Sequence, residues 1–156
     1  MIEESRENVA KSYDFSQFEK IVEFVKNEDI ISPFILKLYP RLKVLLAVSP
    51  DISEKTKKNK EIKNRCEITT VNFPQTIPPG SLLYLVYNFF HQINEELKIK
   101  FLENFSKSTE VYTRLLIIDK IEDEKYYNEL LKKTGFIMTN VIRTKTEFTI
   151  IEALRK

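Results

Sequence analysis

The chain has 156 residues, a length that suits one domain around a single buried core. Hydrophobic residues make up 42% and charged residues 31%, as in an ordinary soluble protein, and no apolar run reaches the ~18–20 residues that cross a bilayer. The net charge of +2 comes from nearly equal numbers of acids and bases, which gives no general reason to expect a nucleic-acid partner.

Targeting and cysteine signals point to a reducing compartment. Residues 1–15 carry acidic side chains and no apolar core, so they lack the pattern of a signal peptide. Cys66 is the single cysteine, which excludes an internal disulfide. The sequence contains none of the short motifs of zinc sites, serine hydrolases or phosphate-binding loops. We therefore expect a cytoplasmic protein with no metal and no membrane partner.

Strand-like and helix-like segments alternate along the chain. Strands are predicted by short apolar or β-branched runs, which fall at residues 20–25, 42–48, 66–71, 82–87 and 112–119. Helices are predicted by apolar residues at helical spacing, which fall at residues 30–39, 93–105 and 126–134. The lysine-rich stretch 53–65 is expected to be a helix with a solvated face, and Gly135 suits the end of the last helix.

The order of these segments predicts the fold class. Alternation of strands and helices indicates a parallel sheet with helices on both faces. The strand at 82–87 is the most hydrophobic, so we expect it at the centre of the sheet. Residues 136–143 and 147–154 flank a turn at 144–146 and predict an antiparallel hairpin. We therefore predict one α/β domain over residues 1–156, with a mostly parallel sheet and a C-terminal antiparallel hairpin.

Several segments, taken in chain order, resemble one known family. Residues 13–18 (YDFSQF) are similar to the YDFSxF that opens the cofactor domain of O-methyltransferases of the acetylserotonin and plant phenolic type. Residues 65–91 are similar to that family's third strand, acidic loop, VPxG turn and fourth strand. LLIIDKI, LLKKTGF and FTIIEA, near the end, resemble its last strands and helix. The resemblance implies the Rossmann-like sandwich of class I methyltransferases, with S-adenosylmethionine as cofactor.

The resemblance also implies parts that this sequence lacks. We expect the family's N-terminal helical domain, which forms the dimer and part of the acceptor pocket, to have no counterpart in this sequence. The segment between the fifth strand and the last helix holds only residues 122–125. We expect part of the pocket wall to be missing. Apolar surface left exposed where the helical domain would dock predicts a homo-oligomer or a separate helical partner chain.

The resemblance places the cofactor at the carboxyl ends of the first three strands. Glu23 keeps the family's acidic position, but no glycine follows it to let the ligand approach the backbone. The family's ribose-binding aspartate falls on Val48, with Asp51 as the alternative acceptor. The adenine-binding residue falls on Asn72, whose amide oxygen can still accept a hydrogen bond. Because each lost hydrogen bond costs ~0.5–1.5 kcal/mol, we expect weak or no binding of S-adenosylmethionine.

The sequence leaves two starts open for the helix at 30–39. Ser32 as N-cap, with Pro33 at the first helical position, would place the helix's positive end away from the cofactor loop. Asp29 as N-cap would keep that end close to the loop.

His91 and Asp119 are the candidate catalytic residues. By resemblance, His91 falls on the histidine that takes the proton from the acceptor hydroxyl, and imidazole titrates near neutral pH, as a general base requires. Asp119 falls on the acidic residue that orients this base in plant relatives. The alternative is that His91 is inherited, or caps a helix start beside the core, and has no catalytic role.

Three functions follow, in order of preference. The first is a degenerate O-methyltransferase-like domain, a pseudoenzyme kept as a binding or interaction module. The alternative is an active O-methyltransferase for a small hydroxylated acceptor, with His91 as general base. Nucleic-acid binding through residues 55–65 is the least favoured, because Glu61 interrupts the basic run.

Overall fold

The computed structural model describes residues 2–52 and 65–156, and the lysine-rich helix expected at 53–65 falls almost wholly outside them. Within the described residues, the strands form one seven-stranded sheet in the order β3-β2-β1-β4-β5-β7-β6. The strands are β1 (Lys20–Val25), β2 (Lys43–Val48), β3 (Cys66–Thr70), β4 (Leu83–Tyr87), β5 (Arg114–Asp119), β6 (Phe136–Arg143) and β7 (Thr149–Arg155). The helices are α1 (Ile2–Lys11), α2 (Ser32–Leu38), α4 (Glu95–Ser108) and α5 (Glu124–Lys133), with a 3-10 turn η2 (Phe90–Gln92).

The strand directions confirm the predicted fold class. Neighbours from β3 to β5 pair in parallel, whereas β7 pairs antiparallel with both β5 and β6. β4 stands in the middle of the order and every one of its residues is buried, as the most hydrophobic run predicted. None of the helices in the described part of the chain is both long and apolar enough to cross a membrane.

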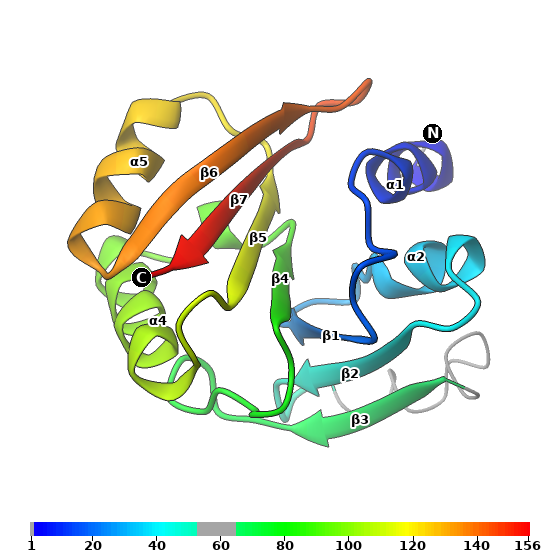
Figure 1. Ribbon diagram of the computed structural model, residues 1–156, viewed down its shortest axis with the longest axis horizontal. Coiled ribbons are helices and arrows are strands. Elements are labelled where there is room, and N and C mark those ends of the chain that lie inside the picture. Colours follow the sequence, from blue (N-terminus) through cyan, green and yellow to red (C-terminus); the bar gives the residue numbers. More distant parts are fainter. Residues whose placement is uncertain (1, 53–64) are drawn as a thin grey trace.

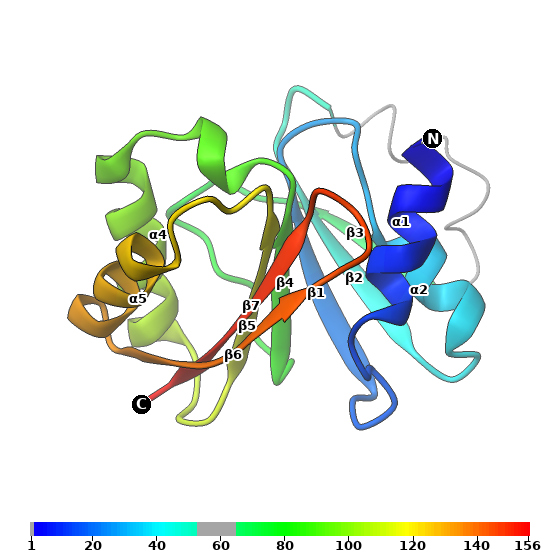
Figure 2. The same ribbon diagram turned by 90° about the horizontal axis from the view of Figure 1, so that it is seen from above.

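Two apolar cores lie on opposite faces of the sheet. Side chains alternate along each strand, so Ile21 and Val25 of β1 join one core while Val22 and Phe24 join the other. Figure 2 shows α1 and α2 on one side of the sheet and α4 and α5 on the other. Covering both faces explains why the central strands are continuous apolar runs.

Helix α1 was not expected from the sequence. Its buried apolar residues are Val9 and Ala10, which lie together in the last turn and give no helical period over its length. Glu3 and Glu4 in the first turn and Lys11 in the last turn complement the helix dipole, and this is the signal that the sequence offered. α1 is held in place by packing against α2.

Neither residue predicted as the N-cap of α2, Ser32 or Asp29, is its N-cap. The N-cap is Ile31, which supplies no side-chain hydrogen bond, and Pro33 lies in the first turn. Ser32 is the first helical residue, and its hydroxyl donates to the carboxylate of Glu23 instead of capping the helix. Asp29 lies outside the helix and is engaged elsewhere, so neither predicted cap is used.

The turn between the last two strands is longer than predicted, because β7 begins at Thr149. The amide of Thr146 donates to the hydroxyl of Thr144 (3.1 Å), and the amide of Phe148 donates to the hydroxyl of Thr146 (3.0 Å). Threonine side chains thus satisfy backbone groups that strand pairing would otherwise use. The turn projects beyond β5 toward α1 (Figure 1).

Gly135 and Gly80 form a matched pair for testing backbone strain. Both have φ of +96°, where an added side chain costs about 1–2 kcal/mol. A Cβ at Gly135 would also lie 2.8 Å from the Ser106 hydroxyl, whereas a Cβ at Gly80 meets nothing within 4 Å. We therefore expect Gly135→Ala to lower the free energy of unfolding more than Gly80→Ala does. Urea unfolding of the two variants measures this, and equal losses would contradict the packing argument.

Candidate functional site

The candidate site lies where β1 and β4 run side by side. The chain passes from β1 outward to β2 and β3 and then returns to β4, so this pair is the topological switch point of the sheet. In open parallel sheets, ligands bind in the crevice outside the carboxyl ends of the strands at this point. Residues 26–31 after β1 and Asn88 after β4 flank the crevice.

Glu23 is fully buried and its carboxylate is used inside the protein. Oε2 accepts from the amide of Ile31 (3.1 Å), and Oε1 accepts from the amide of Ser32 (2.9 Å) and from the Ser32 hydroxyl. Burial raises the pKa of Glu23 to about 7, although the hydrogen bonds from Ser32 and Ile31 act in the opposite direction. Glu23 therefore holds the first turn of α2 and lines none of the hollows described below.

Asp51 and Asn72 are brought together at the ends of β2 and β3. They line an open hollow of about 550 Å³, together with Lys26 and Phe73. The Ser49 hydroxyl donates to Asp51 Oδ1 (2.7 Å), and the Lys26 ammonium lies 4.9 Å from the centroid of the Phe73 ring. We call this the Phe73 hollow. It contains two of the three residues predicted to hold the cofactor, but not Glu23.

Val48, which occupies the position of the family's ribose-binding aspartate, has no polar side-chain group. Val48 is completely buried and belongs to the core under α1 and α2. Asp51, three residues later, is exposed and is the carboxylate nearest in sequence to that place.

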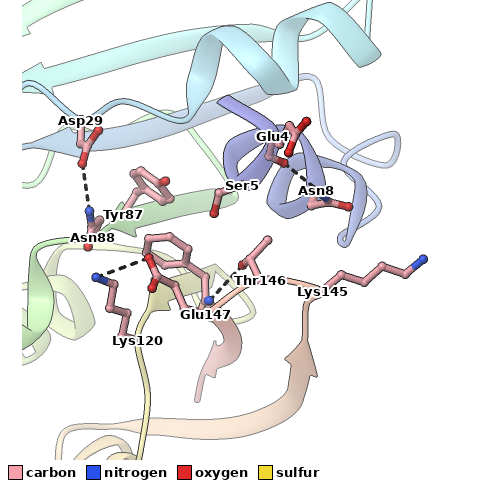
Figure 3. A pocket seen from close by; sticks show the side chains of 11 residues that line it. Glu4, Ser5, Asn8, Asp29, Tyr87, Asn88, Lys120, Lys145, Thr146 and Glu147 are labelled. Carbon is pink, nitrogen blue, oxygen red and sulfur yellow. Dashed lines mark hydrogen bonds and ion pairs between the residues drawn. The ribbon is translucent and has the colours of Figure 1, made fainter. Parts of the chain in front are cut away.

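A second hollow, of about 570 Å³, was not predicted from the sequence (Figure 3). It lies among α1, the loops after β1, β4 and β5, and the turn before β7. The rings of Tyr87 and Phe148 stack at 5.3 Å in its wall, and Lys120 and Glu147 form an ion pair at 3.4 Å. We call this the Phe148 hollow. The signal in the sequence was that Lys120 directly follows a predicted strand, but its neighbours from α1 were not expected.

Side-chain contacts connect α1 with the loops after β1 and β4. Asn88 Nδ2 donates to Asp29 Oδ2 (2.9 Å), and Arg6 of α1 forms an ion pair with Asp29 Oδ1. Asn27 Nδ2 donates to the Asn88 carbonyl (3.4 Å). Asn27 Oδ1 accepts from the amide of Asp29 (2.8 Å). Asn88 has φ of 57°, a left-handed conformation that asparagine tolerates better than most residues. We call the Arg6–Asp29–Asn88 contacts the Asp29 bridge.

The structure places His91 and Asp119 in contact. Asp119 is buried at the end of β5, and its Oδ2 accepts from the amide of His91 (2.8 Å). His91 Nδ1 meets Asp119 Oδ1, which also accepts from the amide of Lys120 (2.9 Å). The His91 side chain is 35% exposed. His91 lines neither the Phe73 hollow nor the Phe148 hollow.

No family model matches the sequence. Over 120 residues, the chain is 28% identical to mitomycin biosynthesis 6-O-methyltransferase of Streptomyces lavendulae, covering 75% of this chain and 34% of that protein. Solved structures show the same fold at lower identity. The mitomycin 7-O-methyltransferase MmcR superposes with a TM-score of 0.89 at 22% identity, over 98% of this chain and 53% of that one.

Human N-acetylserotonin methyltransferase, solved in complex with S-adenosylmethionine, superposes with a TM-score of 0.86 at 16% identity. The alignment covers 97% of this chain and 51% of the human one. The chain thus spans a third to a half of the length of these proteins. The comparisons confirm the resemblance to O-methyltransferases and the Rossmann-like methyltransferase fold.

Glu23→Gln should change how stability depends on pH. Because burial raises the pKa of Glu23 from 4.5 to about 7, the unfolded chain loses this proton at a lower pH than the folded chain. The contribution of Glu23 to the free energy of unfolding of the wild-type protein therefore falls as pH rises from 4.5 to about 7. The Glu23→Gln variant has no ionisable group at this position, so its free energy of unfolding lacks this decrease. Urea unfolding across this pH interval measures the difference. The exposed Glu103→Gln is the control and should keep the wild-type slope, whereas parallel curves for wild type and Glu23→Gln would contradict the argument.

Proposed function

We propose that this chain is an O-methyltransferase-like domain that does not hold S-adenosylmethionine productively and serves as a binding or interaction module. One observation carries the proposal. The acidic residue that the family keeps at the end of the first strand, Glu23, is buried here with both oxygens engaged by Ile31 and Ser32. It has no exposed surface to offer a ligand.

The residues present do not fit the methionine part of the cofactor. That part is zwitterionic and needs free polar groups and close backbone approach beside β1. Asp29, which lies there, is already paired with Arg6 and Asn88. The two glycines of the chain lie elsewhere, at Gly80 and Gly135, so each residue of the β1 loop carries a side chain.

The adenosine part is matched only in part. Asp51 and Asn72 can accept hydrogen bonds in the Phe73 hollow, but Val48 supplies none. The Lys26 ammonium lies over the Phe73 ring, on the surface where a flat base would stack. Two or three lost hydrogen bonds of ~0.5–1.5 kcal/mol each amount to several kcal/mol, and each 1.4 kcal/mol lowers affinity about tenfold.

A second candidate function rests on a different observation. His91 and Asp119 meet as a base and a buried carboxylate would, with the Asp119 side chain also fixed by two backbone amides. This arrangement favours an active O-methyltransferase in which His91 takes the proton of a small hydroxylated acceptor. The residues needed to hold the methyl donor are the part that this alternative lacks.

Calorimetric titration of the protein with S-adenosylmethionine and S-adenosylhomocysteine separates the two functions. We expect no binding in the micromolar range, because the groups that would hold the ligand are engaged or absent. Micromolar binding of either ligand would refute the pseudoenzyme proposal. The next test would then be methyl transfer to small phenols. His91→Ala should lose this activity but should still bind the cofactor as the wild-type protein does.

The proposal includes association with a second copy or with a separate helical chain. Its support is a group of exposed apolar side chains in the turns that precede β4 and β5, at Leu82, Val111 and Tyr112. These turns are neighbours, because the amide of Arg114 donates to the Leu82 carbonyl (2.9 Å). We take residues 1–156 as a single O-methyltransferase-like domain that presents this surface.

Light scattering tests the self-association. If the apolar turns form the contact between copies, the wild-type protein has a mass above that of one 18.5 kDa chain, and Val111→Ser with Tyr112→Ser lowers it. Ile137→Ser, at an exposed apolar residue of β6, is the control and should leave the mass unchanged. A wild-type protein that is monomeric at high concentration would exclude the homo-oligomer.

A further inference from the structure

A third hollow, of about 610 Å³, lies at the opposite edge of the sheet from the sites described above. It is lined by residues 17–20, which lead into β1, by residues 79–82, which lead into β4, and by residues 108–110, where α4 ends. β1 and β4 pair in parallel, so this hollow is at their amino ends. The Phe73 and Phe148 hollows are at the carboxyl ends of the strands. We call the third one the Phe18 hollow.

Hydrogen bonds fix the segments that line the Phe18 hollow. The Ser81 hydroxyl donates to the Lys20 carbonyl (2.7 Å), which ties the segment before β4 to the start of β1. The Glu110 carbonyl accepts from the Thr113 amide (3.1 Å), which closes the turn after α4. A lining held in this way is already formed in the free protein, so a ligand loses little affinity to ordering it.

Part of this lining is apolar. The Leu82 side chain is 53% exposed, the Phe18 ring is half-buried, and Pro79 is exposed. An apolar group of a ligand that covers these side chains removes them from water, which favours binding. The volume also falls within the range of ~300–1,000 Å³ that is typical of small-molecule pockets.

Two carboxylates and one ammonium group supply the charges of the lining. Glu19 and Glu110 are exposed, and neither side chain forms an ion pair within the described part of the chain. Among the described residues of the lining, Lys20 is the one cation. α4 ends at Ser108, so the negative end of its dipole adds to the two carboxylates, offset in part by Lys107 outside the lining. The hollow therefore favours a positively charged group over a neutral or negative one.

We propose that the Phe18 hollow binds a small organic cation, in which a primary ammonium group is carried by an aromatic or branched apolar body. The carboxylates of Glu19 and Glu110 hold the ammonium group, and Phe18 and Leu82 contact the apolar body. Hydrogen bonds from an ammonium group to a carboxylate are stronger than those between neutral groups. This inference goes beyond the proposed function, because no residue assigned to cofactor binding or catalysis lines this hollow.

The test is an NMR titration with three probes that share a phenyl ring and a two-carbon chain. The chain ends in an ammonium group in 2-phenylethylammonium, in a hydroxyl in 2-phenylethanol and in a carboxylate in 3-phenylpropionate. The Gly80 amide belongs to the lining of the Phe18 hollow and reports binding there. The Asn88 amide, in the lining of the Phe148 hollow, is the control for binding at the carboxyl edge of the sheet.

We expect 2-phenylethylammonium to shift the Gly80 resonance saturably, with a dissociation constant of about 1 mM, and to leave Asn88 unmoved. 2-Phenylethanol should bind about tenfold more weakly because it lacks the charge, and 3-phenylpropionate should not bind because the carboxylates repel it. A Gly80 resonance that does not move with about 10 mM ammonium probe, ten times the expected dissociation constant, overturns the proposal. Equal affinities for the ammonium probe and the alcohol overturn it too.

Substitutions in the lining separate the effect of charge from a loss of folding. Glu19→Gln and Glu110→Gln should each weaken binding of 2-phenylethylammonium about threefold. Lys20→Gln should strengthen it by a similar factor, because it removes a like charge, and a gain in affinity cannot come from unfolding. Glu103→Gln, at an exposed position of α4 outside the lining, is the matched control and should bind as wild type does. Affinities that are the same in all four variants overturn the assignment.

Leu82 also belongs to the apolar turns proposed for association, so the titration is repeated with the variant that carries Val111→Ser and Tyr112→Ser. This variant should bind 2-phenylethylammonium at least as tightly as the wild-type protein does, and a Gly80 resonance that stays unmoved in both proteins overturns the proposal. The result is independent of the cofactor. Failure here leaves the pseudoenzyme proposal standing, and micromolar binding of S-adenosylmethionine refutes that proposal without affecting the Gly80 titration.

Discussion

Glu23 of β1 is buried in the core, where its carboxyl group needs hydrogen-bond donors because burying an unpaired acid costs free energy. The donors are the amides of Ile31 and Ser32, at the start of α2. This contact fixes where α2 begins and therefore the path of the loop 26–31, which connects β1 to that helix. The path of the loop in turn places Asp29 beside Asn88, so this contact depends on the buried acid.

The carboxyl edge of the sheet consequently holds separate groups of side chains. Asp51 and Asn72 share the Phe73 hollow, and Asp29 and Asn88 line the Phe148 hollow. His91 meets Asp119 and is in neither lining. A transferase needs donor, acceptor and base to converge on one point. That these groups do not share one lining is one reason why we propose a binding module.

The comparison with solved methyltransferases shows how far a fold can be kept while the sequence changes. A TM-score of 0.89 at 22% identity means that the backbone is shared while most side chains differ. The apolar alternation of the strands is enough to maintain the sheet, because many apolar residues satisfy it. Groups that hold a ligand are under no such structural requirement, which is why fold alone does not give function.

The sequence by itself determined the strands, their mostly parallel order and the closing hairpin, because apolar runs and β-branched residues are local signals. It also placed His91 shortly after the fourth strand and Asp119 at the end of the fifth, and these two strands pair in parallel. Only the tertiary structure decided the partners of Glu23, the packing of α1 and the Asp29 bridge. These depend on which loops meet in space: Arg6 and Asp29 are 23 residues apart, and Asp29 and Asn88 are 59 apart. No periodicity within a segment encodes such a contact.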